Sequence, residues 1–263
     1  MGDPAGIGGE IALKTWKEKS GSADLPFFLI DDPERLKTLA DDLSLNIPIQ
    51  TISSPGMASE VFRNALPVLP ETLPERVTPG VPSSATASSV VRSIDRALEL
   101  VLSGDASAMV TNPIHKSTLY DAGFNYPGHT EYLAARSKAQ CEPVMMLVSP
   151  SVRVVPATIH LSLRDAIETL SIEGLVRCTM TTAKALQNEF GIEHPRIAVA
   201  GLNPHAGENG HLGREEIDII SPAIEQLNNA GLDINGPFPS DSYSMKLHGG
   251  AMTLSFACIT TKH

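Results

Sequence analysis

Apolar residues along the chain alternate between short continuous runs and longer stretches with helical spacing. The continuous runs predict strands at residues 25–30, 108–111, 144–148, 152–158 and 197–201. The helical spacing predicts helices at residues 7–19, 84–102, 172–190 and 215–230. In the second of these helices Val90, Ile94 and Val101 share one apolar stripe, which indicates a side that faces a core. This alternation predicts an α/β fold, with a largely parallel or mixed sheet covered by helices.

The densest cluster of Gly, Asn and His follows the strand predicted at residues 197–201. Residues 201–213 are Gly-Leu-Asn-Pro-His-Ala-Gly-Glu-Asn-Gly-His-Leu-Gly, and an acidic helix start, Glu215-Glu216, comes soon afterwards. Ligands of open α/β sheets bind at the carboxyl ends of strands, where glycine lets the backbone approach and histidine binds metals or moves protons. The alternative is a turn that needs Asn-Pro and Gly only for its geometry.

Two predicted strands are each followed by a histidine. His160 comes after the strand at residues 152–158, and His205 comes after the strand at residues 197–201. Neutral imidazole is the commonest protein ligand for zinc and similar cations. A single histidine in such a place is more often a hydrogen-bonded structural residue, but two beside Gly-rich backbone favour a metal site. A catalytic zinc site usually has three protein ligands, and these segments supply two.

His129 and Thr130 precede a helix that is predicted to begin at Glu131. The surrounding residues 126–131 are Tyr-Pro-Gly-His-Thr-Glu. Helix N-termini bind anions through free N–H groups and the helix dipole, so this stretch predicts a phosphate or carboxylate pocket. The alternative is that Thr130 is an ordinary N-cap residue.

Composition narrows the class of protein. A chain of 263 residues can bury one large core or two modest ones. Its formal net charge of −10 argues against a nucleic-acid partner, although a local cationic pocket can still hold a phosphorylated small molecule. Three cysteines without a C-x-x-C motif indicate a reducing cytoplasm and no disulfide framework. No signal peptide and no membrane-spanning apolar run is expected, and so no membrane partner.

Five motifs occur in the order and at the spacing of one known family. They are Gly-Asp-Pro-Ala-Gly-Ile-Gly (residues 2–8), Asn-Pro-Ile-His-Lys (112–116), Pro-Gly-His-Thr-Glu (127–131), Thr-Ile-His-Leu-Ser-Leu-Arg (158–164) and Asn-Pro-His-Ala-Gly-Glu (203–208). Through them the chain, from Gly2 to about Asp241, resembles the 4-hydroxythreonine-4-phosphate dehydrogenase family of pyridoxal phosphate biosynthesis. Sister enzymes that act on threonate or erythronate 4-phosphate look similar, so those substrates stay open.

The resemblance implies a homodimer with a two-domain α/β/α fold and a mixed sheet, similar to isocitrate and isopropylmalate dehydrogenases. It implies oxidation, with decarboxylation, of 4-phosphohydroxy-L-threonine by NAD or NADP. A divalent cation (Zn, Mg or Co) is held at the family's dimer interface by three histidines, two of which match His160 and His205. The family's substrate contacts match His129 and Thr130, and Asp241 matches a segment near its active site as the candidate catalytic residue. No cofactor-binding residue is assigned, because residues 6–9 are not a G-x-G-x-x-G fingerprint.

The chain departs from the family pattern at three places. Gly9 replaces a proline at a helix start, which loosens that turn. The family has a strand before the first motif, and beyond Met245 it has a Tyr-His-Asp-Gln motif with the third metal histidine, followed by Lys, Asn and Arg substrate contacts. We therefore expect truncation at both ends. The expected domains are residues 1–125, which lack the first strand, residues 126–245, and a non-family tail at 246–263.

The tail contains the missing motif in another reading frame. Back-translation of residues 252–263, read from the third base of the Met252 codon, permits Asp-Ala-Val-Phe-Cys-Met-Tyr-His-Asp-Gln-Ala-Leu. This predicts a frameshift between about Asp241 and Gly250, so that Cys258 and His263 carry no chemistry. Two alternatives stay open: a catalytically impaired fragment of the family, and a metal-dependent lyase or hydrolase, which NAD consumption distinguishes from a dehydrogenase.

Overall fold

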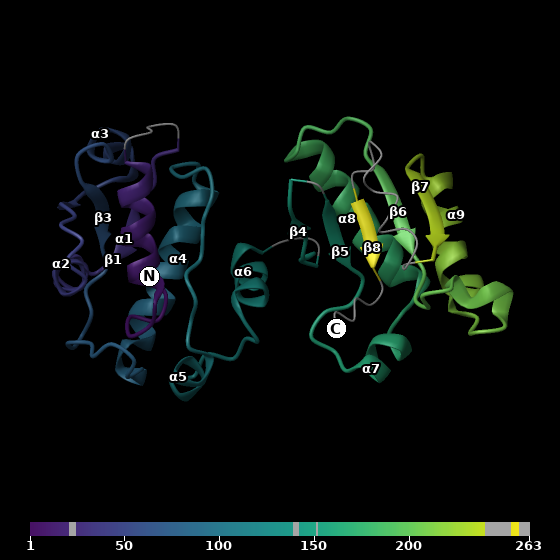
Figure 1. Ribbon diagram of the computed structural model, residues 1–263, viewed down its shortest axis with the longest axis horizontal. Helices are drawn as coiled ribbons and strands as arrows, with labels where there is room; N and C mark the ends of the chain where they lie inside the picture. Colours follow the sequence, from purple (N-terminus) through teal and green to yellow (C-terminus); the bar gives the residue numbers. More distant parts are fainter. Residues whose placement is uncertain (21–24, 139–141, 151, 240–253, 258–263) are drawn as a thin grey trace. The chain divides into compact units, whose positions relative to one another are not determined.

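The computed structural model describes residues 1–20, 25–138, 142–150, 152–239 and the backbone of residues 254–257. The chain divides into two compact units, Met1–Ala139 and Gln140–His263 (Figure 1). From the sequence we expected the division after residue 125, whereas the structure assigns the helix that begins at His129 to the first unit. Most of the expected tail at residues 246–263, and Asp241, lie outside the described residues.

The first unit contains a three-stranded parallel sheet. The strand order is β1 (Leu29–Asp31), β3 (Leu66–Pro70), β2 (Ile49–Thr51). The helices are α1 (Gly8–Lys19), α2 (Pro33–Asp42), α3 (Ala58–Val61), α4 (Ala87–Leu102), α5 (Lys116–Asp121) and α6 (His129–Ser137), with 3-10 turns η1 (Pro55–Met57) and η2 (Ser84–Thr86). Leu13, Leu36, Phe62 and Leu66 are fully buried between helices and sheet, and form the centre of this core.

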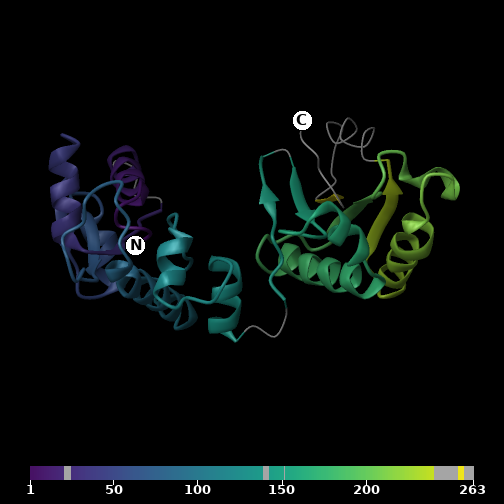
Figure 2. The ribbon, with the colours of Figure 1, turned by 90° about the horizontal axis from the view of Figure 1, so that it is seen from below.

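The second unit contains a five-stranded mixed sheet. The strand order is β4 (Leu147–Val148), β5 (Arg153–Pro156), β8 (Leu254–Ala257), β6 (Arg196–Ala200), β7 (Asp233–Phe238). Only β4 runs antiparallel to its neighbour; the other pairs are parallel. The helices are α7 (Leu163–Glu168), α8 (Ile172–Asn188) and α9 (Ser221–Asn229), with a 3-10 segment η3 (Ala206–Gly210) and a π-helical turn η4 (Glu216–Ile220). Helices α8 and α9 pack together against the sheet (Figure 2).

Several predicted elements are confirmed, and local signals explain them. Helix α8 begins where the Ser171 hydroxyl accepts a hydrogen bond from the Gly174 N–H at 3.2 Å. Helix α4 buries Val90 and Ile94 on the predicted stripe. The predicted strands at residues 152–158 and 197–201 correspond to β5 and β6, so the α/β class and the mixed sheet are confirmed.

The strand predicted at residues 108–111 is wrong. These residues form no strand, and the side chain of Val110 is 95 % exposed. An apolar run becomes a strand only when a neighbouring strand satisfies its backbone groups, and this run has no such neighbour in the described structure. In the described part of the chain, no helix is long and apolar enough to cross a membrane.

Candidate functional site

The first motif is in close contact with the loop at residues 112–116. The Asp3 N–H donates to the Pro113 carbonyl at 2.9 Å. A Cβ on Gly2 would lie 2.5 Å from that carbonyl, and a Cβ on Gly8 would lie 2.9 Å from the Cβ of Asn112. Only glycine allows these approaches, so the two motifs pack against each other at the start of α1.

Cationic groups surround His129, the first residue of α6. Burial lowers the pKa of His129, and the Met1 ammonium and Lys116 lower it further. The Nε2 atom of His129 is buried and makes no hydrogen bond within the described part of the chain. Around the position that a Cβ would take on Gly128, Glu131 Oε2 lies at 3.6 Å and Lys116 Nζ at 3.9 Å. The neutral imidazole therefore lies near two positive charges and the Glu131 carboxylate at a helix N-terminus, whose free N–H groups and Lys116 can bind an anion.

The predicted helix start at Glu131, and with it the alternative that Thr130 is the N-cap residue, is wrong. Helix α6 begins at His129, and its N-cap is Gly128, whose extended backbone has φ of −177° and which supplies no side-chain cap. Thr130 is therefore inside the first turn with an exposed side chain. Because no side chain caps this end, N–H groups of the first turn stay available to a ligand.

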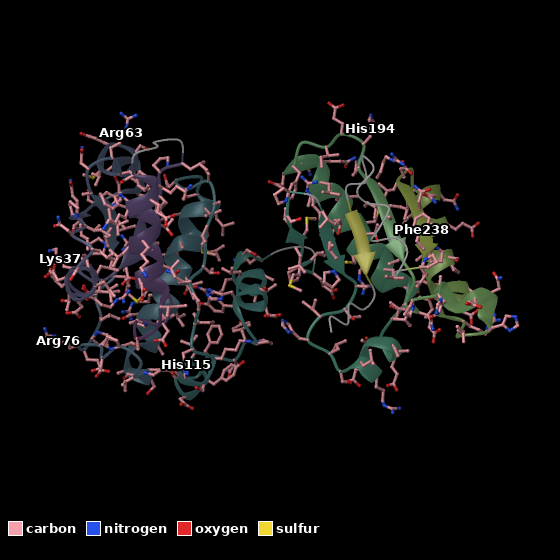
Figure 3. The ribbon with its side chains drawn as sticks, viewed as in Figure 1. Lys37, Arg63, Arg76, His115, His194 and Phe238 are labelled. Atoms are coloured by element: carbon pink, nitrogen blue, oxygen red, sulfur yellow. The ribbon has the colours of Figure 1, made fainter. Side chains whose placement is uncertain are left out.

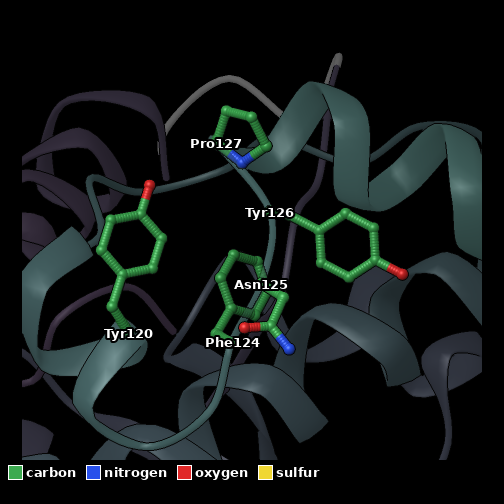
Figure 4. Close-up of a pocket in the computed structure, with 5 residues that line it drawn as sticks. All are labelled: Tyr120, Phe124, Asn125, Tyr126 and Pro127. Carbon is green, nitrogen blue, oxygen red and sulfur yellow. The ribbon is translucent and has the colours of Figure 1, made fainter.

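An aromatic cluster supports the segment that carries His129 and Thr130. The rings of Phe124 and Tyr126 lie 5.0 and 5.1 Å from that of Tyr132 on α6. The Tyr132 hydroxyl donates to Asp95 on α4 at 2.6 Å, and burial, followed by this carboxylate, raises the pKa of Tyr132. An open hollow of about 390 Å³ lies here, with Tyr120 and Tyr126 on its two sides (Figure 4). The loop before α6 is thus anchored to α4.

His160 stands in an unusual backbone conformation four residues after the end of β5. Its φ is 57°, in the left-handed region that residues other than glycine rarely adopt, and its side chain is exposed. Such conformations occur often at functional sites, because the surrounding structure must stabilise them. Ser162 then caps α7 by accepting a hydrogen bond from the Asp165 N–H at 3.2 Å.

His205 immediately precedes the turn η3, in a loop of strained backbone. Positive φ angles occur at Ala206, Gly207, Glu208, Asn209, Gly210 and Gly213. The His205 N–H donates to Asn203 Oδ1 at 2.9 Å, and the Asn203 N–H donates to Glu216 Oε1 at 3.1 Å. Asn203 and Glu216 were not among the site residues predicted from the sequence. The sequence features that could have identified them are an asparagine two residues before His205 and a carboxylate at the start of the next helix.

His160 and His205 follow two strands of the second unit whose carboxyl ends lie at the same edge of the sheet. Strands β5 and β6 are both parallel to β8, which lies between them, so their carboxyl ends are at one edge. Imidazole donors suit a zinc-like cation. Within the described ranges, however, no group of three or more His, Cys, Asp or Glu side chains is arranged to hold a metal ion. His129 and Thr130 belong to the other unit.

Comparisons with known proteins agree with the motifs. Residues 24–258 match the family model of the pyridoxal phosphate biosynthetic protein PdxA, so the match extends into residues 246–258, which we expected to lie outside the family. A 4-hydroxythreonine-4-phosphate dehydrogenase of Methylorubrum extorquens is 47 % identical over 248 residues, which cover 92 % of this chain and 71 % of that protein. The enzyme of the same name from Zymomonas mobilis is 42 % identical, with the same two coverages.

A solved structure gives the same result at the level of the fold. The crystal structure of 4-hydroxythreonine-4-phosphate dehydrogenase from Klebsiella pneumoniae matches with a TM-score of 0.88 and 35 % identity. The match covers 98 % of this chain and 79 % of that one. The chain therefore belongs to the pyridoxal phosphate biosynthetic protein PdxA family, an oxidoreductase family whose matched members are dehydrogenases of pyridoxal phosphate biosynthesis.

Proposed function

We propose that this protein's substrate is 4-phosphohydroxy-L-threonine, which it oxidises, with decarboxylation, using NAD or NADP. The observation that carries the proposal is that His160 and His205 follow β5 and β6, whose carboxyl ends lie at one edge of the mixed sheet, in a chain that is 47 % identical to a named relative. A ligand between these strand ends would lie where open α/β sheets bind their substrates.

In this proposal His129 and Thr130 bind an anionic group of the substrate. The N–H groups of the first turn of α6 and the Thr130 hydroxyl donate hydrogen bonds to it. Lys116 adds a positive charge close to Gly128. Because its lowered pKa keeps His129 neutral near pH 7, the imidazole can donate from one ring nitrogen while the other accepts. The anchoring of α6 to α4 holds these donors in place.

His160 and His205 are the proposed ligands of a divalent cation, for which we consider Zn, Mg and Co. Their exposed imidazoles fit Zn and Co better than Mg, which prefers oxygen ligands. When bound, the cation supplies Lewis acidity toward the substrate oxygen, and the nicotinamide accepts a hydride. The part played by this chain is to hold both imidazoles in place, and the described residues supply no third ligand. We also keep Asp241 as a proposed catalytic residue.

We propose that residues 246–263 are read out of frame, because the alternative frame supplies a histidine that can be the third metal ligand. Strand β8 lies between β5 and β6 and is parallel to both. In the alternative frame, the stretch that overlaps β8 is Ala-Val-Phe-Cys, and Met-Tyr-His follows it. A histidine there would follow the carboxyl end of β8, between the strands that precede His160 and His205. It would complete the usual set of three zinc ligands.

Three further proposals concern architecture and context. We propose the two-domain α/β/α arrangement of isocitrate and isopropylmalate dehydrogenases, supported by the division into two units that each contain a sheet. We propose a homodimer, supported by Leu147 and Val148, which are exposed on the edge strand β4. We propose a cytoplasmic location, supported by cysteine usage.

An impaired fragment is the second candidate, because the described residues provide only two of the expected ligands. The test compares the chain as written with its frame-corrected form. Formation of NADH or NADPH is measured with 4-phosphohydroxy-L-threonine and with threonate and erythronate 4-phosphates. We expect the corrected form to prefer 4-phosphohydroxy-L-threonine. The activity of the chain as written should fall by more than the roughly 10–100-fold that is typical when a residue next to a metal ligand is changed, because here a metal ligand itself is missing.

Matched variants connect the activity to the proposed residues. His160→Ala and His205→Ala should abolish turnover in the corrected form, and His129→Ala should raise KM. His194→Ala is the control, because His194 is an exposed histidine before the amino end of β6 (Figure 3). If the corrected form turns over threonate or erythronate 4-phosphate as fast as 4-phosphohydroxy-L-threonine, or faster, the proposed substrate is wrong. Equal activity of both forms would refute the frame proposal, and no reduction by either would refute the dehydrogenase proposal.

A further inference from the structure

The side chain of Glu216 is a carboxylate in a position where the fold otherwise buries apolar groups. Glu216 is only 3 % exposed, at the start of the π-helical turn η4. Ile220, Ile224 and Leu227 follow on the same buried face, and all three belong to the core of the second unit. Burying a carboxylate is costly unless its oxygens are hydrogen-bonded or paired. Because burying this carboxylate costs free energy, we expect Glu216 to have a role other than packing.

The loop that carries His205 is wrapped around this carboxylate. A Cβ on Gly201 would lie 2.9 Å from Glu216 Oε1, and a Cβ on Gly207 would lie 2.6 Å from Oε2. Both residues are buried glycines, and Gly207 also has a φ of 70°. The backbone can therefore approach the carboxylate on both sides of His205, and a larger residue at either position would force the loop away.

Two hydrogen bonds connect the carboxylate to His205. Glu216 Oε1 accepts from the Asn203 N–H at 3.1 Å, and Asn203 Oδ1 accepts from the His205 N–H at 2.9 Å. The Asn203 side chain also donates from Nδ2 to the Leu212 carbonyl at 3.3 Å. Asn203 thus spans the loop, and Glu216 holds Asn203 from beneath. The exposed imidazole of His205 gains its position through these backbone contacts.

We propose that Glu216 is a positioning residue, which acts through Asn203 to hold His205 in the conformation that binds the divalent cation. This inference rests on the metal role proposed for His205. Glu216 Oε2 has no hydrogen-bond partner in the described part of the chain, and only Oε1 is used. The role therefore requires an acceptor at Oε1 and not the negative charge. A glutamine can supply that acceptor, whereas an alanine cannot.

The test uses the frame-corrected chain, which carries all three proposed ligands, and two readouts. Amide hydrogen exchange of His205 reports the loop directly, and calorimetric titration with Co²⁺ or Zn²⁺ reports the affinity of the site. We expect Glu216→Ala to accelerate exchange at His205 and to weaken metal binding roughly 10–100-fold, as is typical when support of a ligand is removed. Glu216→Gln should keep both properties within about threefold of the parent, because it loses no hydrogen bond.

Two controls separate positioning from general destabilisation. Ile224→Ala removes a buried apolar group from the same helix face and should lower the stability while leaving exchange at His205 unchanged relative to its neighbours. Glu225→Ala removes an exposed carboxylate of α9 and should change nothing. If Glu216→Ala does not fold, Asn203→Ala removes the acceptor for the His205 N–H in the loop itself and should have the same effect on both readouts.

The outcomes are distinct. Unchanged exchange at His205 in Glu216→Ala, or equal damage from Glu216→Gln, overturns the inference. The inference is also overturned if Ile224→Ala accelerates exchange at His205 as much as Glu216→Ala does, because the acceleration then reflects general destabilisation. If the frame-corrected parent binds no metal, accelerated exchange at His205 in Glu216→Ala still supports the hydrogen-bonded relay, and the proposed metal role is refuted. The failure of one proposal is thus separable from the failure of the other.

Discussion

Gly207 lies against the carboxylate of Glu216, so closely that a Cβ on Gly207 would stand 2.6 Å from Oε2. The contact joins a loop residue to the first residue of η4, and it occurs where the loop backbone is left-handed, with φ of 70° at Gly207. Two separate physical requirements therefore select glycine here: conformational freedom and the absence of a side chain.

Gly207→Ala should destabilise the second unit by about 1–3 kcal/mol, because it adds a steric clash to the strain of a positive φ. Gly191→Ala is the matched control. Gly191 also has a positive φ, of 66°, but no atom lies within 4 Å of its would-be Cβ, so only the strain remains. Urea unfolding measures both variants. Equal losses of free energy would show that the contact with Glu216 is unimportant.

The first unit depends on a buried ion pair between Asp31 and Arg35. The Arg35 guanidinium donates to Asp31 at 2.7 and 3.0 Å, the two side chains are 2 % and 11 % exposed, and Arg35 also donates to the Pro4 carbonyl. Arg35→Ala removes the guanidinium from this buried carboxylate, which keeps the hydrogen bond from the Asp32 N–H at 2.8 Å, and should cost about 3–5 kcal/mol.

The control for that variant lies on the same helix. Lys37 pairs with Glu34 on the exposed surface of α2, and its side chain projects outward (Figure 3). Lys37→Ala should cost about 0–1 kcal/mol, because an exposed pair gains little from its attraction. Thermal and urea unfolding measure both. A loss from Arg35→Ala no larger than that from Lys37→Ala would contradict the argument.

The stability of the first unit should fall below about pH 6.5 through His129. Burial, the Met1 ammonium and Lys116 lower the pKa of His129 in the folded state, whereas the unfolded chain keeps the ordinary value of about 6.5. As the pH falls through this value, the unfolded state takes up the proton first, so the folded state loses relative stability. The contribution is fully present above the unfolded pKa.

Lys116→Met tests the electrostatic part of this shift. Removing the positive charge should raise the pKa of His129 toward its ordinary value without restoring it, since burial is the largest cause. Titration of the His129 ring by NMR in the parent and in the variant measures the change. A parent pKa at or above the ordinary value would refute the description of the pocket as cationic and desolvated.

Gly8→Ala should disturb the contact between the first motif and the loop at residues 112–116. Its Cβ would lie 2.9 Å from the Cβ of Asn112, which cannot move without displacing the loop. Asn112→Gly removes the opposing atom, so the double variant should be more stable than the sum of the single losses predicts. Unfolding of the four proteins of the cycle measures this coupling, and strict additivity would exclude the clash.

Local patterns in the sequence were sufficient for the long helices and for part of the site. Helices α4 and α8 follow from apolar spacing, because that signal acts over a few turns of helix. The two strand-end histidines follow from the same logic, since a strand followed by a loop is visible in the chain. The family motifs supplied His129 and Thr130 as candidates.

Tertiary structure decided the features that need distant partners. Strand β3, Leu-Pro-Val-Leu-Pro, was not predicted because its prolines obscure the pattern, yet it pairs with strands on both sides. The run at residues 108–111 has the pattern of a strand but no neighbour in the described structure, so it stays irregular. Backbone pairing between remote segments, and not local preference, settles both cases.

The hydrogen bonds that position His205 show most clearly which features the sequence determined and which the tertiary structure decided. The sequence determined that His205, Asn203 and Glu216 exist near a strand end and a helix start. Only the folded chain showed that Glu216 is buried beneath the loop and reaches Asn203, which in turn holds His205. A glutamate at a helix start is ordinarily solvated, and the three-dimensional packing of loop, glycines and helix face is what places this one in the interior.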